Sequence, residues 1–268
     1  MLESDLDLLR NAAIGAGKIA MGFYQKNPIS WDKGDGQGPV SEADLEIDKM
    51  LFNYLSKARP DYSFLSEEAE NNTDRYTTKN VFIIDPIDGT KSFLNGHENF
   101  ATSIAVARNG VIHTAVVYLP AKDLLYEAQK DEGSRLNGVQ IHTGNNTNIN
   151  GARILASESQ SNPKLWKDTP PPIERHFRSS LAYRLCLVAE GRFDGMMTLR
   201  PTWEWDVAAG NLICTEAGCE VRTQEGDCPI YNSEASKMNG MIAGNSILVN
   251  KLLGYIKYTV INSLEDYL

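Results

Sequence analysis

Apolar side chains recur at helical spacing in two segments near the start of the chain. Across residues 5–24 they repeat every three or four positions, which predicts an amphipathic helix. A second amphipathic helix is predicted to begin near Ser41, to continue to about Lys57 and to end before Pro60. Residues 33–39 lie between the two helices and hold three glycines and a proline, so we expect a mobile loop there.

Short apolar runs bounded by turn residues predict strands in the middle of the chain. The runs at 62–65 and 81–84 stop close to carboxylates, a pattern typical of buried strands that carry side chains to the edge of a sheet. Asn109-Gly110 predicts a tight hairpin between the first two of three later strands. These later strands are predicted at 100–107, 111–118 and 124–128.

Strands and helices alternate in the last part of the chain. The polar stretch 144–151 shows no apolar period and marks a boundary. We therefore expect an α+β domain at 1–147 and an α/β domain at 148–268, which gives an α/β fold class. The alternating elements are predicted strands at 153–157, 193–198 and 240–243, and predicted helices at 181–190, 207–217 and 246–256.

Composition restricts the classes of function. The chain has 268 residues, of which 42% are hydrophobic and 23% charged, values that are typical of a folded globular protein. A net charge of −9 opposes a nucleic-acid polymer as partner, because phosphate backbones need clustered cations. The apolar runs are too short for a membrane span, and the acidic N-terminus does not resemble a signal peptide. Four cysteines without a Cys-x-x-Cys pair are typical of reduced thiols, so we expect a cytoplasmic protein. A homodimer is left open.

The segment Asp-Pro-Ile-Asp-Gly-Thr at 85–90 is the most informative part of the sequence. Pro86 is predicted to stop the preceding strand, and Gly89 to allow a tight turn before a short helix. The turn would gather Asp85 and Asp88, which repel each other unless a hard cation lies between them. Backbone N–H groups at the start of a helix can bind phosphate. This combination predicts metal-assisted phosphoryl chemistry.

Other carboxylates occur in similar surroundings. Glu67 and Glu68 follow the first predicted strand, and Asp44 lies at the start of the second predicted helix. Asp206 lies among indoles and small residues, where an unpaired carboxylate would be costly and a metal ion would remove that cost. We expect Glu67, Asp44 and Asp206 to share one centre with the two aspartates described above, and Glu68 to point elsewhere.

Four motifs in order are Val-Ser-Glu-Ala-Asp at 40–44, Ser-Glu-Glu at 66–68, Asp-Pro-Ile-Asp-Gly-Thr at 85–90 and Trp-Asp-Val-Ala-Ala-Gly at 205–210. Together they resemble the motif set of the inositol monophosphatase superfamily, and the match extends over essentially the whole chain. The resemblance implies a Mg²⁺-dependent, lithium-sensitive phosphomonoesterase that acts on a small phosphate ester. It also implies a layered αβαβα sandwich with the metal cluster between its two parts.

The resemblance implies a set of metal ligands. Glu67, Asp85 and the carbonyl of Ile87 would hold one Mg²⁺, and Asp85, Asp88 and Asp206 would hold a second. The glycine-rich loop would contribute a weak third site, so two or three ions are expected.

The resemblance also implies how the ester is cleaved. Asp88 and the amides of Gly89 and Thr90 would bind the phosphate. Asp44 would accept a hydrogen bond from the Thr90 hydroxyl, and with Glu67 these groups would orient and deprotonate a metal-activated water that attacks phosphorus in line.

The residues before Asp206 suggest the substrate. Inositol-specific members carry a glutamate seven residues before the aspartate of the last motif, and this chain has Leu199 there. Residues 200–206 are instead similar to those of 3′(2′),5′-bisphosphate nucleotidases of the CysQ type. By this resemblance the residues that contact the substrate would be Ser179, Ser180, Trp203 and Glu204.

The resulting hypothesis is hydrolysis of 3′-phosphoadenosine 5′-phosphate to AMP and phosphate. Trp203 would offer the adenine a stacking face, and Arg178 or Arg184 would reach the second phosphate. Residues 133–138 look more like the inositol branch, so inositol-1-monophosphatase activity is the alternative. Fructose-1,6-bisphosphatase activity, and a non-catalytic member of the fold that docks onto polymerase or ribosomal machinery, are further alternatives.

Overall fold

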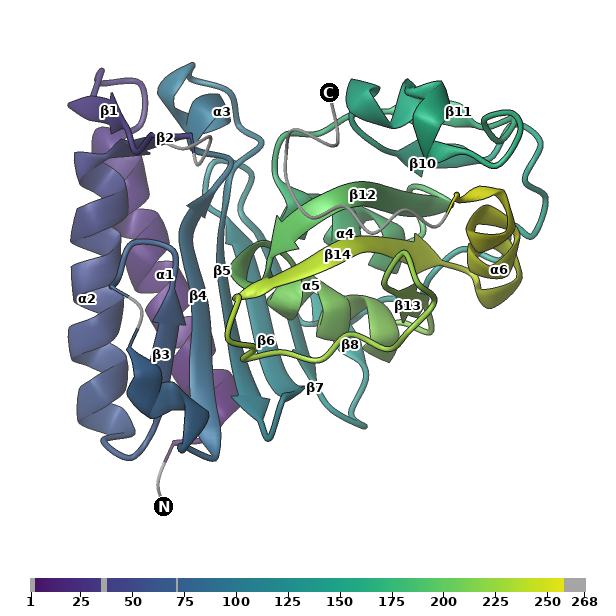
Figure 1. Cartoon of the computed structure of the whole chain (residues 1–268). Helices are drawn as coiled ribbons and strands as arrows, with labels where there is room; N and C mark the ends of the chain where they lie inside the picture. The colour runs from purple at the N-terminus through teal and green to yellow at the C-terminus, as the bar shows by residue number, and fades with distance from the viewer. Residues whose placement is uncertain (1–2, 35–37, 71, 258–268) are drawn as a thin grey trace.

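In the described part of the chain, the two large sheets alternate with three helical layers (Figure 1). Helices α1 (Asp5–Phe23) and α2 (Glu42–Ala58) cover one face of the larger sheet. Helices α4 (Leu181–Ala189) and α5 (Glu204–Glu216) lie between the two sheets, and α6 (Ser246–Tyr255) covers the far face of the smaller sheet. This order confirms the predicted αβαβα fold class. The computed structural model describes residues 3–34, 38–70 and 72–257.

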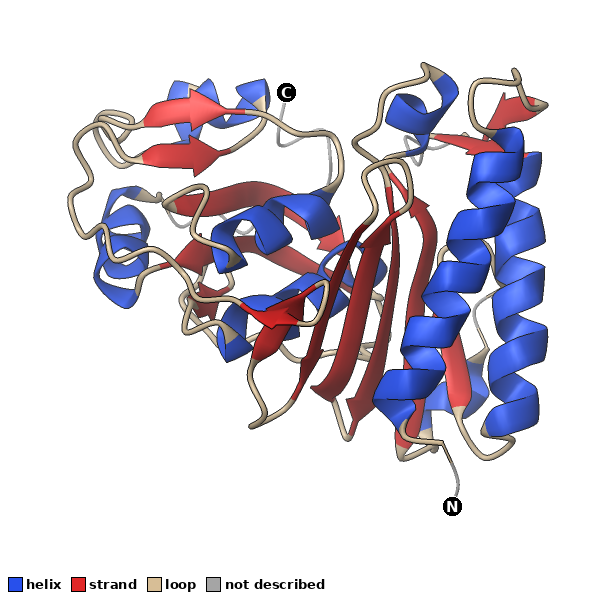
Figure 2. Cartoon of the chain, turned by 180° about the vertical axis from the view of Figure 1, so that it is seen from behind, coloured by secondary structure: helices blue, strands red, loops and turns tan. Residues whose placement is uncertain are grey.

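The larger sheet, in the described part of the chain, has the strand order β3-β4-β5-β6-β7-β8-β9. Strand β3 is parallel to β4, and all other neighbours are antiparallel (Figure 2). Asn109 and Gly110 have φ angles of 51° and 80°, which confirms the tight hairpin between β5 and β6. The strands are β3 (Ser63–Ser66), β4 (Asn80–Asp88), β5 (Ala101–Arg108), β6 (Val111–Leu119), β7 (Leu124–Gln129), β8 (Ser134–Leu136) and β9 (Val139–Gln140).

The smaller sheet has the order β11-β10-β12-β14-β13. Strand β10 is parallel to both of its neighbours, and the other pairs are antiparallel. Its strands are β10 (Arg153–Leu155), β11 (Glu174–His176), β12 (Gly195–Trp203), β13 (Glu220–Arg222) and β14 (Lys237–Gly244). The remaining elements are the pair β1 (Ser30–Asp32) and β2 (Pro39–Ser41), the short helix α3 (Thr90–Leu94), and the 3₁₀ turns η1 (Thr73–Tyr76), η2 (Glu158–Ser161) and η3 (Pro163–Leu165).

The largest apolar core lies between the two sheets, around α4 and α5. Gly210 of α5 lies so close to α4 that a Cβ there would be 2.5 Å from a methyl carbon of Leu185. This core includes side chains from both sides of the boundary predicted at residues 147 and 148, and that boundary stays a prediction. Within the described residues, no helix is both long and apolar enough to cross a bilayer.

Strand β4 does not stop at Pro86, as the sequence predicted, but continues to Asp88. The register with β5 shifts between Asp85 and Asp88, which pair with Ser103 and Ala101. The missing N–H of the proline falls inside this irregularity, where it costs no regular ladder hydrogen bond. The strand therefore carries both aspartates to its C-terminal end, opposite the first turn of α5.

Candidate metal centre and active site

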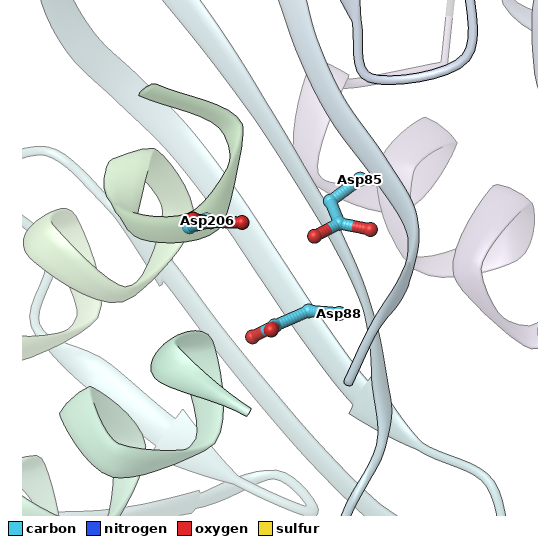
Figure 3. Close-up of side chains that lie close together, drawn as sticks. All are labelled: Asp85, Asp88 and Asp206. Atoms are coloured by element: carbon cyan, nitrogen blue, oxygen red, sulfur yellow. The ribbon is translucent and has the colours of Figure 1, made fainter. Parts of the chain in front are cut away.

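Three aspartates from distant parts of the chain meet where β4 ends and α5 begins. Asp85 and Asp88 lie on β4, and Asp206 lies in the first turn of α5. Each offers a carboxylate oxygen, and these oxygens all lie within 4.8 Å of one another. Figure 3 shows the three side chains directed toward the space between the strand and the helix. The structure thus brings together three of the predicted metal ligands.

Asp88 is held by the N-terminus of α4. Its Oδ2 accepts hydrogen bonds from Ser180 Oγ at 2.6 Å and from the amide of Ala182 at 2.7 Å, and its Oδ1 lies 3.3 Å from the amide of Leu181. Burial raises the pKa of Asp88 to about 6, although these donors favour the charged form. The orientation of Asp88 is therefore fixed by protein groups.

Asp85 is less well satisfied than Asp88, and Asp206 is half-buried beside it. Asp85 is 1% exposed, and among the described residues its Oδ1 has no hydrogen-bond partner. Burial raises the pKa of Asp85 well above its usual range, and the charges of Glu67, Asp88 and Asp206 raise it further. Burial and the same cluster of charges also raise the pKa of Asp206. Carboxylates that repel each other in a buried place, with an orphaned oxygen, fit a hard divalent cation.

Glu67 has a cation of its own. The Lys33 Nζ lies 2.8 Å from Glu67 Oε1 and 2.6 Å from Glu68 Oε1. Burial raises the pKa of Glu68 to about 7, and the neighbouring charge of Glu67 adds to this rise. From the sequence, Lys33 was included only in the predicted mobile loop. The one sequence signal for its ion pairs was a lysine at the start of a glycine-rich stretch.

Asp44 and Thr90 lie together, as the resemblance implied. Asp44 is fully buried, and its Oδ2 accepts hydrogen bonds from the amide and hydroxyl of Ser41 at 2.9 and 2.6 Å. Its Oδ1 is 3.3 Å from the Thr90 hydroxyl oxygen, which also lies 3.0 Å from the Ile87 carbonyl. Burial raises the pKa of Asp44 to about 6. These contacts place a carboxyl group with a near-neutral pKa beside the aspartate cluster.

The two serines predicted to contact the substrate are engaged within the protein. Ser180 is fully buried, donates to Asp88 and accepts from the amide of Tyr183 at 2.9 Å. The Ser179 hydroxyl donates to the Asn99 carbonyl at 2.8 Å. The structure therefore gives Ser180 the role of capping α4 and holding Asp88, which differs from the predicted one.

Trp203 and Glu204 also differ from expectation. The Trp203 ring stacks on Trp205, with centroids 4.6 Å apart, and the Lys237 Nζ lies 3.7 Å from the Trp203 centroid, so both faces of the indole are covered. Glu204 is 0% exposed, and its carboxylate accepts hydrogen bonds from Ser233. Glu204 therefore has no free surface for a substrate, whereas Trp203 is half-buried and has neighbours on its indole faces.

Two arginines lie near the aspartates, Arg184 on α4 and Arg200 on β12. Arg184 is 5% exposed, and its Nε donates to the Arg178 carbonyl at 2.5 Å. Burial lowers the pKa of Arg184 to about 10, the charge of Asp88 opposes this shift, and the charge of Arg200 adds to it. Arg200 also lowers the pKa of Asp206, so both cations act on the cluster. Sequence reasoning considered Arg184 but not Arg200.

Comparison with known proteins identifies the family. The profile of the inositol monophosphatase family matches residues 1–259. Two relatives are each 31% identical: an inositol-1-monophosphatase of Mesorhizobium japonicum, aligned over 94% of this chain and 96% of its own length, and a fructose-1,6-bisphosphatase/inositol-1-monophosphatase of Aquifex aeolicus, aligned over 96% of both. The crystal structure of extragenic suppressor protein SuhB from Bartonella henselae is similar with a TM-score of 0.77, over 92% of this chain and 96% of that one, at 30% identity. This chain belongs to the inositol monophosphatase family.

Proposed function

We propose that this protein is a Mg²⁺-dependent phosphomonoesterase. The observation that carries the proposal is the group of the buried Asp85 and Asp88 with the half-buried Asp206, none of which forms an ion pair within the described ranges. Unneutralised carboxylates in such a place are costly, and carboxylate oxygens are the ligands that Mg²⁺ prefers. Membership of a phosphatase family supports the same reaction class.

We assign the ligands as the family resemblance implies. Glu67, Asp85 and the Ile87 carbonyl would hold one ion, and Asp85, Asp88 and Asp206 would hold the second. Bound Mg²⁺ would neutralise charge on the transferred phosphoryl group and acidify a water molecule. Asp88 can serve here because a carboxylate has about four acceptor positions, and its contacts with α4 leave one of them free.

Asp44 and Thr90 would move the proton of the attacking water. Thr90 Oγ1 can pass its proton to Asp44 Oδ1, 3.3 Å away, and take one from the water, which Glu67 would help to orient. A carboxyl group with a pKa of about 6 is suited to accept a proton near neutral pH. Asp44 would therefore be the final proton acceptor of this relay.

The turn after Asp88 would bind the phosphate. Gly89 has a φ of 100°, and a Cβ at this position would lie 3.0 Å from the Asn99 carbonyl oxygen, so the turn needs glycine. The amides of Gly89 and Thr90 begin α3 and have no acceptor within that helix. These two amides, with Asp88 beside them, would hold the phosphate oxygens.

The substrate that we propose first is 3′-phosphoadenosine 5′-phosphate, which yields AMP and phosphate. It is supported by Arg184 and Arg200, which provide positive charge beside the aspartates for a second anionic group. The adenine would not stack on Trp203 unless Lys237 moved away. Inositol 1-phosphate is the second candidate, because the Mesorhizobium and Aquifex relatives carry inositol-1-monophosphatase in their names.

A substrate panel tests this proposal. Phosphate release is measured with 3′-phosphoadenosine 5′-phosphate, inositol 1-phosphate and fructose 1,6-bisphosphate, with and without Mg²⁺ and Li⁺. Higher kcat/KM on the nucleotide, dependence on Mg²⁺ and inhibition by Li⁺ are expected. A clear preference for the inositol ester would overturn the proposed substrate and leave the proposed metal chemistry unaffected.

A pair of aspartate variants tests the site itself. We expect Asp88→Asn to lower kcat by about a hundredfold or more, because it removes a ligand and a charge that act on the reacting phosphate. Asp131→Asn is the matched control, an exposed aspartate in a turn with a φ of 67° that asparagine tolerates. Equal activity of both variants would favour a non-catalytic member of the family.

A further inference from the structure

Arg75 forms a buried junction between two distant parts of the chain. It lies in η1, shortly before β4, and is 0% exposed. Its Nη1 donates to Asn232 Oδ1 at 2.6 Å, and its Nη2 donates to the Ser233 carbonyl at 3.0 Å and to Ser236 Oγ at 2.9 Å. In return, Asn232 Nδ2 donates to the Arg75 carbonyl at 2.9 Å.

The same loop holds the start of α5. The Glu204 carboxylate accepts hydrogen bonds from the amide of Asn232 at 2.5 Å, and from the amide and hydroxyl of Ser233 at 2.9 and 2.5 Å. The Glu204 amide donates to the Ser236 carbonyl at 2.9 Å. Residues 232–236 therefore lie between a buried guanidinium and a buried carboxylate, with each charge satisfied by the loop.

The placement of this junction matters for the metal centre. Arg75 precedes the strand that carries Asp85 and Asp88, and Glu204 lies two residues before Asp206. Buried polar networks that are fully hydrogen-bonded are rigid. A site for Mg²⁺ needs ligands at nearly fixed positions, so the residues behind the ligands control affinity.

We propose that Arg75 and Glu204 are positioning residues, which fix Asp206 opposite Asp85 and Asp88 through the loop 232–236. The inference rests on the proposed function, since it takes these aspartates to be Mg²⁺ ligands. Neither residue would touch the substrate, so their effect on turnover passes through the metal centre.

The sharpest test is Asn232→Gly in the full-length protein. Asn232 has a φ of 65°, which glycine adopts readily, so the variant removes the side-chain contacts with Arg75 and leaves the backbone unstrained. Mg²⁺ binding to metal-free protein is measured by titration calorimetry. We expect the Mg²⁺ dissociation constant to rise by about tenfold or more, which is the scale found when residues that support metal ligands are replaced. kcat should recover at high Mg²⁺ concentration.

Asn137→Gly is the matched control. Asn137 has a φ of 48°, accepts a hydrogen bond from the Leu125 amide and donates one to the Asp123 carbonyl, so its loss also removes two side-chain contacts at a left-handed position. It lies in the turn between β8 and β9. We expect its melting temperature to fall while its Mg²⁺ affinity stays at the wild-type value. Arg75→Lys provides a second test variant, because lysine keeps the positive charge but lacks the two guanidinium nitrogens that donate to the loop.

The outcomes separate this inference from the proposed function. If Asn232→Gly and Asn137→Gly both leave Mg²⁺ affinity unchanged, the inference is overturned and the proposed function is untouched. If Asn232→Gly weakens Mg²⁺ binding but the wild-type protein releases no phosphate from any ester in the panel, the inference is supported and the function is overturned. A wild-type protein that binds no Mg²⁺ would overturn both.

Discussion

The Lys33 ammonium lies 2.8 Å from the carboxylate of Glu67, whose charge in turn raises the pKa of Asp85. Lys33 therefore offsets part of the negative charge of Glu67 and Glu68. Asp85, Asp88 and Asp206 have no cation within hydrogen-bonding distance in the described structure. A metal ion that uses Glu67 has to compete with Lys33.

Removing that competitor is expected to strengthen metal binding. In Lys33→Met, Glu67 and Glu68 lose an ion pair, and the negative charge available to Mg²⁺ increases. We expect the Mg²⁺ dissociation constant to fall about threefold to tenfold, the scale of a partly exposed ion pair. Titration calorimetry on metal-free protein measures it, with Lys33→Arg as the charge-keeping control. Weaker binding in Lys33→Met would mean that Lys33 assists the metal.

Metal-free protein is expected to lose stability as the pH rises. Burial raises the pKa of Asp44 and of Asp88 to about 6 and also raises that of Asp85 and Asp206. Such groups bind more protons in the folded chain, so the free energy of unfolding falls between the unfolded pKa of about 4 and the folded value.

Thermal melts measure this effect. The melting temperature in EDTA should be several degrees lower at about pH 7 than at about pH 5, and Mg²⁺ should reverse most of the loss. A melting temperature that rises with pH in EDTA, or that does not respond to Mg²⁺, would contradict this account of the buried aspartates.

Arg184 is expected to select substrates with a second anionic group. The charges of its guanidinium and of Asp88 interact, so in the proposed site Arg184 would border the scissile phosphate. We expect Arg184→Met to raise KM for 3′-phosphoadenosine 5′-phosphate about tenfold, the scale of one charge-assisted hydrogen bond, with a much smaller effect on inositol 1-phosphate. Steady-state kinetics on both esters decide it, with Arg192→Met as a control arginine that pairs with Glu190. Equal increases of KM for both esters would mean that Arg184 contacts the phosphate group that both esters share.

The close approach of α4 and α5 gives a stability prediction. A Cβ on Gly210 would lie 2.5 Å from one Leu185 side-chain carbon and 2.6 Å from another. Gly210→Ala should therefore lower the free energy of unfolding by about 1–3 kcal/mol through overpacking. Gly22→Ala, also inside a helix but with open space around it, should raise stability by about 0.5–1 kcal/mol. Chemical denaturation measures the free energy of unfolding of both variants. An unchanged value for Gly210→Ala would mean that α4 and α5 move apart freely.

Local patterns in the sequence predicted much of the fold. The helical spacing near the N-terminus gave α1 and α2 to within one or two residues, and Asn109-Gly110 gave the hairpin between β5 and β6. Helix α5 begins at Glu204, three residues before its predicted start, because hydrogen bonds from a distant loop hold its first turn. Contacts of this kind do not appear in local periodicity.

The candidate site was predicted in part for the same reason. Asp85, Asp88 and Asp206 could be grouped from strand ends, apolar surroundings and the family resemblance, and they do lie together. Lys237, which covers one face of Trp203, comes from another strand and leaves no trace beside it in the sequence. Motifs predict which side chains gather, whereas free space depends on neighbours from elsewhere in the chain.

Diffraction from crystals soaked with Mn²⁺, collected at the manganese absorption edge, tests the central claim most directly. We predict an anomalous peak enclosed by the carboxylates of Asp85, Asp88 and Asp206, and a second beside Glu67 and Asp85. Manganese found only elsewhere on the protein, with these carboxylates turned away from any ion, would contradict it.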